Sequence, residues 1–127
     1  HCACEGVPLY IVSQKTRTNL YDPKKANLRQ QARAWMHQNN FFDTDGLGFS
    51  SDNLYFEDDR IKKVDRIAQI GITHFVDDLL EVFEEPRFPP ATKKILFATE
   101  PGQYEDCGVP VYRSWNQIFE LIFADAK

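Results

Sequence analysis

Short apolar runs recur along the chain, and each is bounded by polar or turn-forming residues. Runs of this kind are typical of buried strands, which are covered on both faces in a parallel sheet. The pattern predicts strands at residues 9–12, 54–56, 72–76 and 94–98. Residues 109–112 form a further short segment. Because Pro110 cannot donate to a strand ladder, we expect this segment at a sheet edge.

Apolar residues at helical spacing fill most intervals between these runs. They predict helices over residues 24–40, about 60–70, 79–83 and 115–123. Asp58 or Asp59 is expected to cap the second of these helices and Gly71 to end it, while Ser114 is expected to cap the last.

Strands and helices therefore alternate along the whole sequence. This order predicts an α/β fold built from βα units, with a mostly parallel sheet and helices on both faces. No internal repeat or low-complexity linker interrupts the pattern, so residues 1–127 are expected to form a single domain.

The composition narrows the class of protein. Hydrophobic residues make up 43% of the 127 residues and aromatic residues 13%, which excludes a disordered chain. A net charge of −4 argues against a nucleic-acid partner, because binding to phosphate backbones requires a basic surface. No apolar run approaches the ~18 to 20 residues of a membrane span, so no membrane partner is expected.

The three cysteines do not make a complete disulfide framework, since Cys2 and Cys4 are close neighbours and Cys107 is far away. Reduced thiols in a cytoplasmic protein are the favoured interpretation. A metal site at His1, Cys2 and Cys4 is the alternative, although structural zinc sites usually need a second cluster of ligands.

Ligands of open parallel sheets bind beyond the carboxyl ends of the strands. The polar residues that follow the predicted strands are therefore candidate site residues: Ser13, Asp77, Asp78, Thr99 and Glu100. Paired carboxylates at such a rim favour a hard cation such as Mg²⁺. Lys62 or Lys63 could reach the same rim, and a hydroxyl, an ammonium and a metal carboxylate together form a phosphate-binding set.

The same residues also have purely structural interpretations. Ser13 could be a turn residue, Lys62 and Lys63 could be solvated, and Asp77 or Asp78 could cap the turn at Leu79. His74, inside an apolar run, is expected to be packed or bonded to a partner rather than to act as a base. The basic residues of the first helix are expected to form an exposed face: Lys24, Lys25, Arg29 and Arg33.

Three segments carry a resemblance to a known family. They read Leu-Tyr-Ile-Val-Ser-Gln-Lys-Thr at 9–16, Arg-Ile-Lys-Lys at 60–63, and Thr-His-Phe-Val-Asp-Asp-Leu-Leu-Glu-Val-Phe at 73–83. Their order resembles the haloacid dehalogenase (HAD) superfamily, in its phosphatase-like branch, over about residues 5–123. The resemblance implies a Rossmann-type fold and a Mg²⁺ cofactor.

The resemblance also implies a role for each matching residue. Ser13, with Gln14 beside it, would bind the transferred phosphoryl group. Lys63, with Lys62 as the second choice, would stabilise the phosphoryl charge. Asp77, supported by Asp78, would hold Mg²⁺.

One family feature is missing. The first strand of HAD proteins ends in Asp-x-Asp, and the first Asp is the nucleophile. In this chain Asp43-Thr44-Asp45 has that spacing, but it follows a helix and lies in a Gly-rich loop. We therefore expect an N-terminally truncated version of the fold, in which Asp77 alone cannot perform covalent phosphoryl transfer.

The missing strand would lie between the counterparts of the strands at 9–12 and 72–76. Unpaired backbone groups in that slot would be costly. The two strands could close on each other, a strand from another copy could fill the gap, or the sequence could be a fragment of a longer chain. Of these outcomes we expect self-association, as a homodimer or a strand-exchanged oligomer.

Two functions follow as hypotheses. The first is a HAD-like phosphatase-type domain, which would hydrolyse a small phosphorylated molecule in a complete version and be inactive as this chain alone. The second is a non-catalytic binding or assembly protein with the same fold. The aromatic residues Trp115, Phe119 and Phe123 could then face a partner, although packing in the core is the expected role of that helix.

Overall fold

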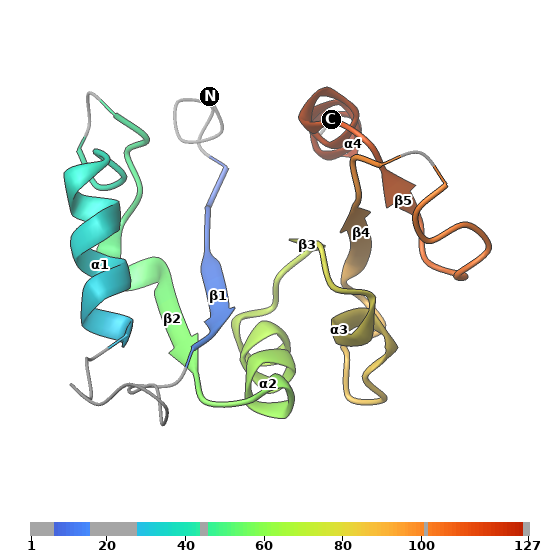
Figure 1. Cartoon of the computed structure of the whole chain (residues 1–127), viewed down its shortest axis with the longest axis horizontal. Helices are drawn as coiled ribbons and strands as arrows, with labels where there is room; N and C mark the ends of the chain where they lie inside the picture. Colours follow the sequence, from blue (N-terminus) through green and yellow to red (C-terminus); the bar gives the residue numbers. More distant parts are fainter. Residues whose placement is uncertain (1–6, 16–27, 44–45, 101, 126–127) are drawn as a thin grey trace. The chain divides into compact units, whose positions relative to one another are not determined.

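The structure, a computed structural model, describes residues 7–15, 28–43, 46–100 and 102–125. The chain divides into two compact units, His1–Lys63 and Val64–Lys127, and each is described by itself. Strands and helices alternate along the described residues, except that the strand at Val111–Tyr112 follows the strand at Lys93–Phe97 with no described helix between them (Figure 1). They form an α/β structure with small parallel sheets, which is compatible with the Rossmann-like class.

The first unit contains two parallel strands, β1 (Ile11–Gln14) and β2 (Leu54–Glu57), paired from Ile11 opposite Leu54 to Gln14 opposite Glu57. Between them lie α1 (Leu28–Gln38) and the short 3₁₀ helix η1 (Ser51–Asn53). Val12, Phe49 and Leu54 are its buried apolar residues within the described part of the chain.

The helix predicted over 24–40 is confirmed for residues 28–38, whereas 24–27 lie outside the described residues. The predicted strand at 9–12 is present but shifted, since β1 runs two residues further, through Ser13 and Gln14.

The helix α2 (Arg60–Ile70) begins before the boundary at Lys63 and continues into the second unit. Both of its predicted ends are confirmed. The Asp59 Oδ1 atom accepts a hydrogen bond from the backbone nitrogen of Lys62 at 2.8 Å. Gly71 closes the helix with a φ of +77°, a conformation that a side chain would strain.

The second unit then continues through β3 (His74–Asp77), α3 (Leu80–Glu84), β4 (Lys93–Phe97), β5 (Val111–Tyr112) and α4 (Trp115–Asp125). Its sheet is parallel with the order β3-β4-β5, so the Pro110 segment lies at an edge, as predicted. Ser114 caps α4 by accepting a bond from the Gln117 nitrogen at 3.3 Å, also as predicted.

The core of the second unit is apolar and aromatic. The rings of Phe75, Phe83 and Phe88 contact one another with centroid separations of 5.4 to 6.5 Å. Ile95 and Leu96 of β4 and Ile118 of α4 are fully buried. Burial of each such side chain contributes about 1.5 to 3 kcal/mol, so this packing fixes β4 between its neighbours. Within the described residues, no helix has both the length and the apolar character of a membrane span.

Candidate functional site

Ser13 and Gln14 occupy the carboxyl end of β1. Ser13 is half-buried opposite Phe56, and Gln14 is exposed opposite Glu57. The pairing extends one residue further, because the Lys15 nitrogen donates to the Glu57 carbonyl at 2.8 Å. Backbone pairing with β2 therefore carries the strand past its apolar run, and Ser13 lies inside β1 rather than in a turn after it.

Lys63 and Lys62 differ in burial. The Lys62 side chain is 57% exposed, and its Nζ atom lies 3.6 Å from Asp58 Oδ2. Lys63 is only 8% exposed. Lys63, which the sequence analysis predicts as the phosphoryl-stabilising lysine, is thus the buried one of the pair, and the expectation of a solvated side chain is wrong for it.

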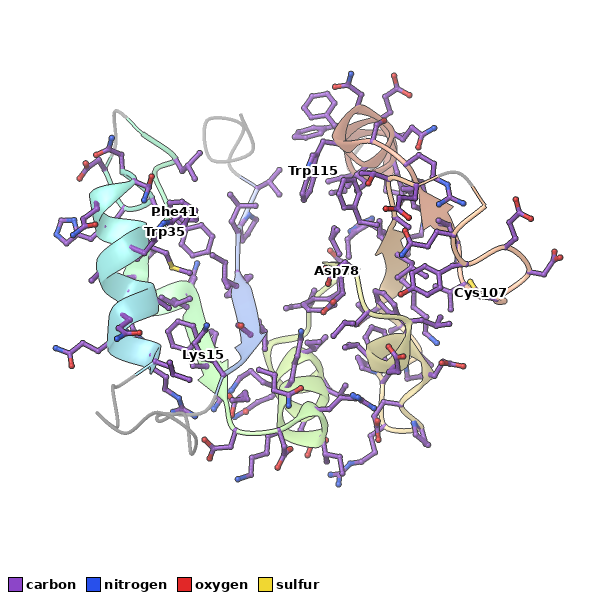
Figure 2. All side chains as sticks on the ribbon, in the orientation of Figure 1. Lys15, Trp35, Phe41, Asp78, Cys107 and Trp115 are labelled. Atoms are coloured by element: carbon purple, nitrogen blue, oxygen red, sulfur yellow. The ribbon has the colours of Figure 1, made fainter. Side chains whose placement is uncertain are left out.

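Arg29 contacts the residues that directly follow β1 and β2. The sequence predicted it on an exposed face of the first helix. Its side chain is only 20% exposed, and it donates both to the Lys15 carbonyl and to the Asp58 carboxylate. Figure 2 labels Lys15 at the end of β1. The two partners are 14 and 29 residues from Arg29 in sequence, so no local pattern could have indicated them. Arg33, in contrast, is exposed as predicted, and its guanidinium lies 5.5 Å from the centroid of the Phe56 ring.

Asp77 and Asp78 lie at the carboxyl end of β3 in the second unit. Asp77 is half-buried, and its Oδ1 atom accepts a bond from the Leu79 nitrogen at 3.0 Å, as the interpretation of Asp77 as a cap of the turn at Leu79 predicts. The N-cap residue of α3 is Leu79, and it makes no side-chain cap bond. Asp78, labelled in Figure 2, is exposed. Among the described residues, these carboxylates belong to no group of three or more His, Cys, Asp or Glu that could hold a metal. Mg²⁺ in proteins is commonly held by one or two carboxylates together with waters, so Asp77 and Asp78 stay a predicted pair of ligands.

Thr99 and Glu100 follow β4 and are exposed. The backbone in this region is held by Arg113, which comes directly after β5. Its guanidinium donates to the carbonyls of Ala98, Glu100 and Gln103 at 2.9, 2.7 and 2.8 Å. Sequence reasoning missed this residue, because the carbonyls that it binds carry no side-chain signature.

His74 lies at the opposite, amino end of the same sheet. Its Nε2 atom is 2.9 Å from Asp125 Oδ2 and its Nδ1 atom is 2.9 Å from Thr73 Oγ1, which confirms a partner-bonded histidine. The Lys93 ammonium donates to the same Asp125 oxygen at 2.6 Å. Hydrogen bonds from Lys93 and then from His74 lower the pKa of Asp125 below its ordinary value.

Several predicted residues lie outside the described part of the chain: His1, Cys2, Cys4, Lys24, Lys25 and the last two residues of Asp43-Thr44-Asp45. The metal site proposed for His1, Cys2 and Cys4 stays a prediction. Cys107 is a free thiol whose Sγ atom lies 3.4 Å from the Val109 carbonyl.

Of the polar residues at the strand ends and Lys63, the first unit contains Ser13, Gln14 and Lys63, and the second unit contains Asp77 and Asp78. Comparison of the chain with models of known families finds no match, and comparisons with curated proteins and with solved structures find none either.

Proposed function

We propose that this chain is a HAD-like phosphatase-type domain, with helices on both faces of its sheet, that binds phosphorylated small molecules. Ser13, Gln14 and Lys63 bind the phosphoryl oxygens. The observation that carries the proposal is the position of Ser13 and Asp77, each within the last two residues of a parallel strand. Carboxyl ends of parallel strands are where open α/β sheets bind ligands.

The candidate residues of the first unit have the chemistry to bind an anion. The Ser13 hydroxyl can donate a hydrogen bond to a phosphoryl oxygen, and the Lys63 ammonium supplies positive charge. Because Lys63 is 8% exposed, its interaction with an anion is screened by water less than that of the exposed Lys62.

Hydrolysis requires a nucleophile as well. No Asp-x-Asp follows an apolar run in this sequence, so the 127 residues alone bind phosphate without turning over an ester. Mg²⁺ belongs to the proposal as the cofactor of a complete version, to which this chain contributes Asp77 and Asp78. We further place the protein in the cytoplasm, in keeping with the free thiol of Cys107.

Phosphate binding tests the proposal directly. Inorganic phosphate added to ¹⁵N-labelled protein is expected to shift the amide signals of Ser13 and Lys63 saturably. Ser13→Ala and Lys63→Ala should each weaken binding about tenfold, as expected for one lost charge-assisted hydrogen bond. Lys62→Ala is the matched control and should bind as the unmodified protein does.

Absence of saturable shifts at Ser13 and Lys63 would contradict the proposal. An assay with p-nitrophenyl phosphate and Mg²⁺ checks the expectation that the chain alone does not hydrolyse phosphate esters. No turnover is expected. Turnover that Asp77→Asn abolishes would show that the chain is an active enzyme.

A non-catalytic binding or assembly role is the second candidate, and α4 favours it. Ile118 is buried, whereas Trp115 and Phe119 are 63% and 41% exposed, so these two aromatic residues depart from the expected core packing. Figure 2 labels Trp115, whose ring centroid lies 5.0 Å from that of Phe97. Under this role, native mass spectrometry should find a homodimer or strand-exchanged oligomer and phosphate titration should find no binding.

A further inference from the structure

Arg29 bridges the carboxyl ends of both strands in the first unit. It is the second residue of α1, and its Nε atom donates to the Lys15 carbonyl at 2.9 Å. Its Nη2 atom donates to Asp58 Oδ1 at 2.5 Å. Lys15 directly follows β1 and Asp58 directly follows β2, so one guanidinium joins the two strand ends.

The guanidinium is suited to this bridge by its shape. Its donors point in fixed directions within one plane, so it can bind a carbonyl and a carboxylate at the same time. The bond to Asp58 is charge-assisted and therefore stronger than a neutral one. The Lys15 nitrogen is meanwhile held by the Glu57 carbonyl. Lys15, the last residue of β1's pairing with β2, is thus held through both its backbone nitrogen and its backbone oxygen.

Asp58 extends the connection towards Lys63. Its second oxygen lies 3.6 Å from Lys62 Nζ, and the next residue, Asp59, caps α2. The Lys63 nitrogen donates to the Asp59 carbonyl at 3.0 Å. Arg29 therefore links the strand that carries Ser13 to the segment that carries Lys63, and both residues belong to the first unit.

We infer that Arg29 is the positioning residue of the phosphate site: it acts through Ser13 and Lys63 by holding their two segments in one geometry. The inference rests on the proposed function. Donors bind an oxyanion well only when they are fixed before it arrives, and a displacement of about 1 Å can cost about a hundredfold in effectiveness.

Arg33 provides the matched control. It lies one turn further along α1 and also contacts β2, but through the ring of Phe56. Substitution of Arg33 removes the same charge from the same helix and leaves the bridge between Lys15 and Asp58 in place.

The test is a titration with inorganic phosphate, followed by the amide signals of Ser13 and Lys63. Arg29→Ala should raise the Kd at least about tenfold, whereas Arg33→Ala should leave it within about twofold. In a double-mutant cycle, Arg29→Ala should cost much less when Ser13→Ala is already present, because a positioning residue acts through its partner. Arg29→Lys, which keeps the charge and loses the fork, should give an intermediate Kd.

Three results would overturn the inference. Equal Kd values for Arg29→Ala and Arg33→Ala would remove it and leave the proposed function standing. Additive effects of Arg29→Ala and Ser13→Ala would show that Arg29 acts only through its charge. No saturable binding by the unmodified protein would contradict both proposals together. If Arg29→Ala lowers amide dispersion, the comparison of Arg29→Lys with Arg33→Lys decides the question instead.

Discussion

Large side chains such as Phe83, Ile95 and Leu96 are fully buried in the second unit, whereas the buried apolar residues described in the first are Val12, Phe49 and Leu54. The strand ends differ too. Arg29 joins those of the first unit through a carbonyl and a carboxylate, while Arg113 joins those of the second through neutral carbonyls alone. Among the described residues, the strand ends of the first unit are thus joined by a contact that includes an ion pair, whereas those of the second are joined through neutral groups.

The largest expected difference concerns the cores. Leu96→Ala should lower the free energy of unfolding of the second unit by about 2 to 5 kcal/mol, because it leaves a cavity in close-packed surroundings. Val12→Ala removes fewer carbon atoms from the first unit and should cost less. Urea denaturation followed by amide exchange in each unit measures both values. Leu79→Ala, at a 48% exposed position, is the control and should stay within about 0.5 kcal/mol.

A smaller effect on the free energy of unfolding is expected for the contacts of Arg113 and Arg29 at the strand ends. Arg113→Ala should cost about 1 to 2 kcal/mol through the loss of bonds to three carbonyls, and about 1 M salt should not change this cost. Asp58→Asn should cost less than about 1 kcal/mol at low salt, and the cost should shrink at about 1 M salt, since it removes a partly exposed ion pair. An equal salt response in both variants would contradict the comparison.

The smallest expected effect is a pH response of the second unit. Lys93 and His74 lower the pKa of Asp125 in the folded state, so the unfolded chain binds a proton there at higher pH than the folded one. The stability from this contact is present above the ordinary aspartate pKa and is lost as pH falls through the lowered value. The difference in free energy of unfolding between Asp125→Asn and the unmodified protein, measured by denaturation, should therefore be smaller below about pH 4 than at pH 6. A constant difference across this range would count against the contact.

Local patterns predicted the positions of most helices and strands and the α/β class. Apolar runs located each strand to within about two residues, and Asp59, Gly71 and Ser114 were identified as helix ends because caps act on neighbouring backbone groups. The sequence misplaced the end of β1, since backbone pairing with β2 and not side-chain polarity decides where a strand stops.

The residues of the candidate site were harder to predict from the sequence than the helices and strands. Ser13 and Asp77 were predicted from their positions after apolar runs, Lys63 from its position at the start of a helix, and all three from the resemblance to HAD proteins. Arg29 could not be found this way, because its partners lie 14 and 29 residues distant. The pairing of His74 with Asp125 spans 51 residues and was foreseen only as an unnamed partner. Side-chain contacts between distant segments depend on tertiary packing, which periodicity does not encode.

The edge strand β5 has a bearing on aggregation. It is two residues long, and Pro110 before it offers a carbonyl to the Leu96 nitrogen of β4 but has no N–H to add to that ladder. The Arg113 nitrogen, directly after β5, donates to Gln117 Oε1 at 2.8 Å and so is already bonded. An incoming strand would find too few donors there to extend the sheet. This border is therefore a poor template for fibrillar growth, and intermolecular strand addition, where it occurs, is directed elsewhere on the molecule.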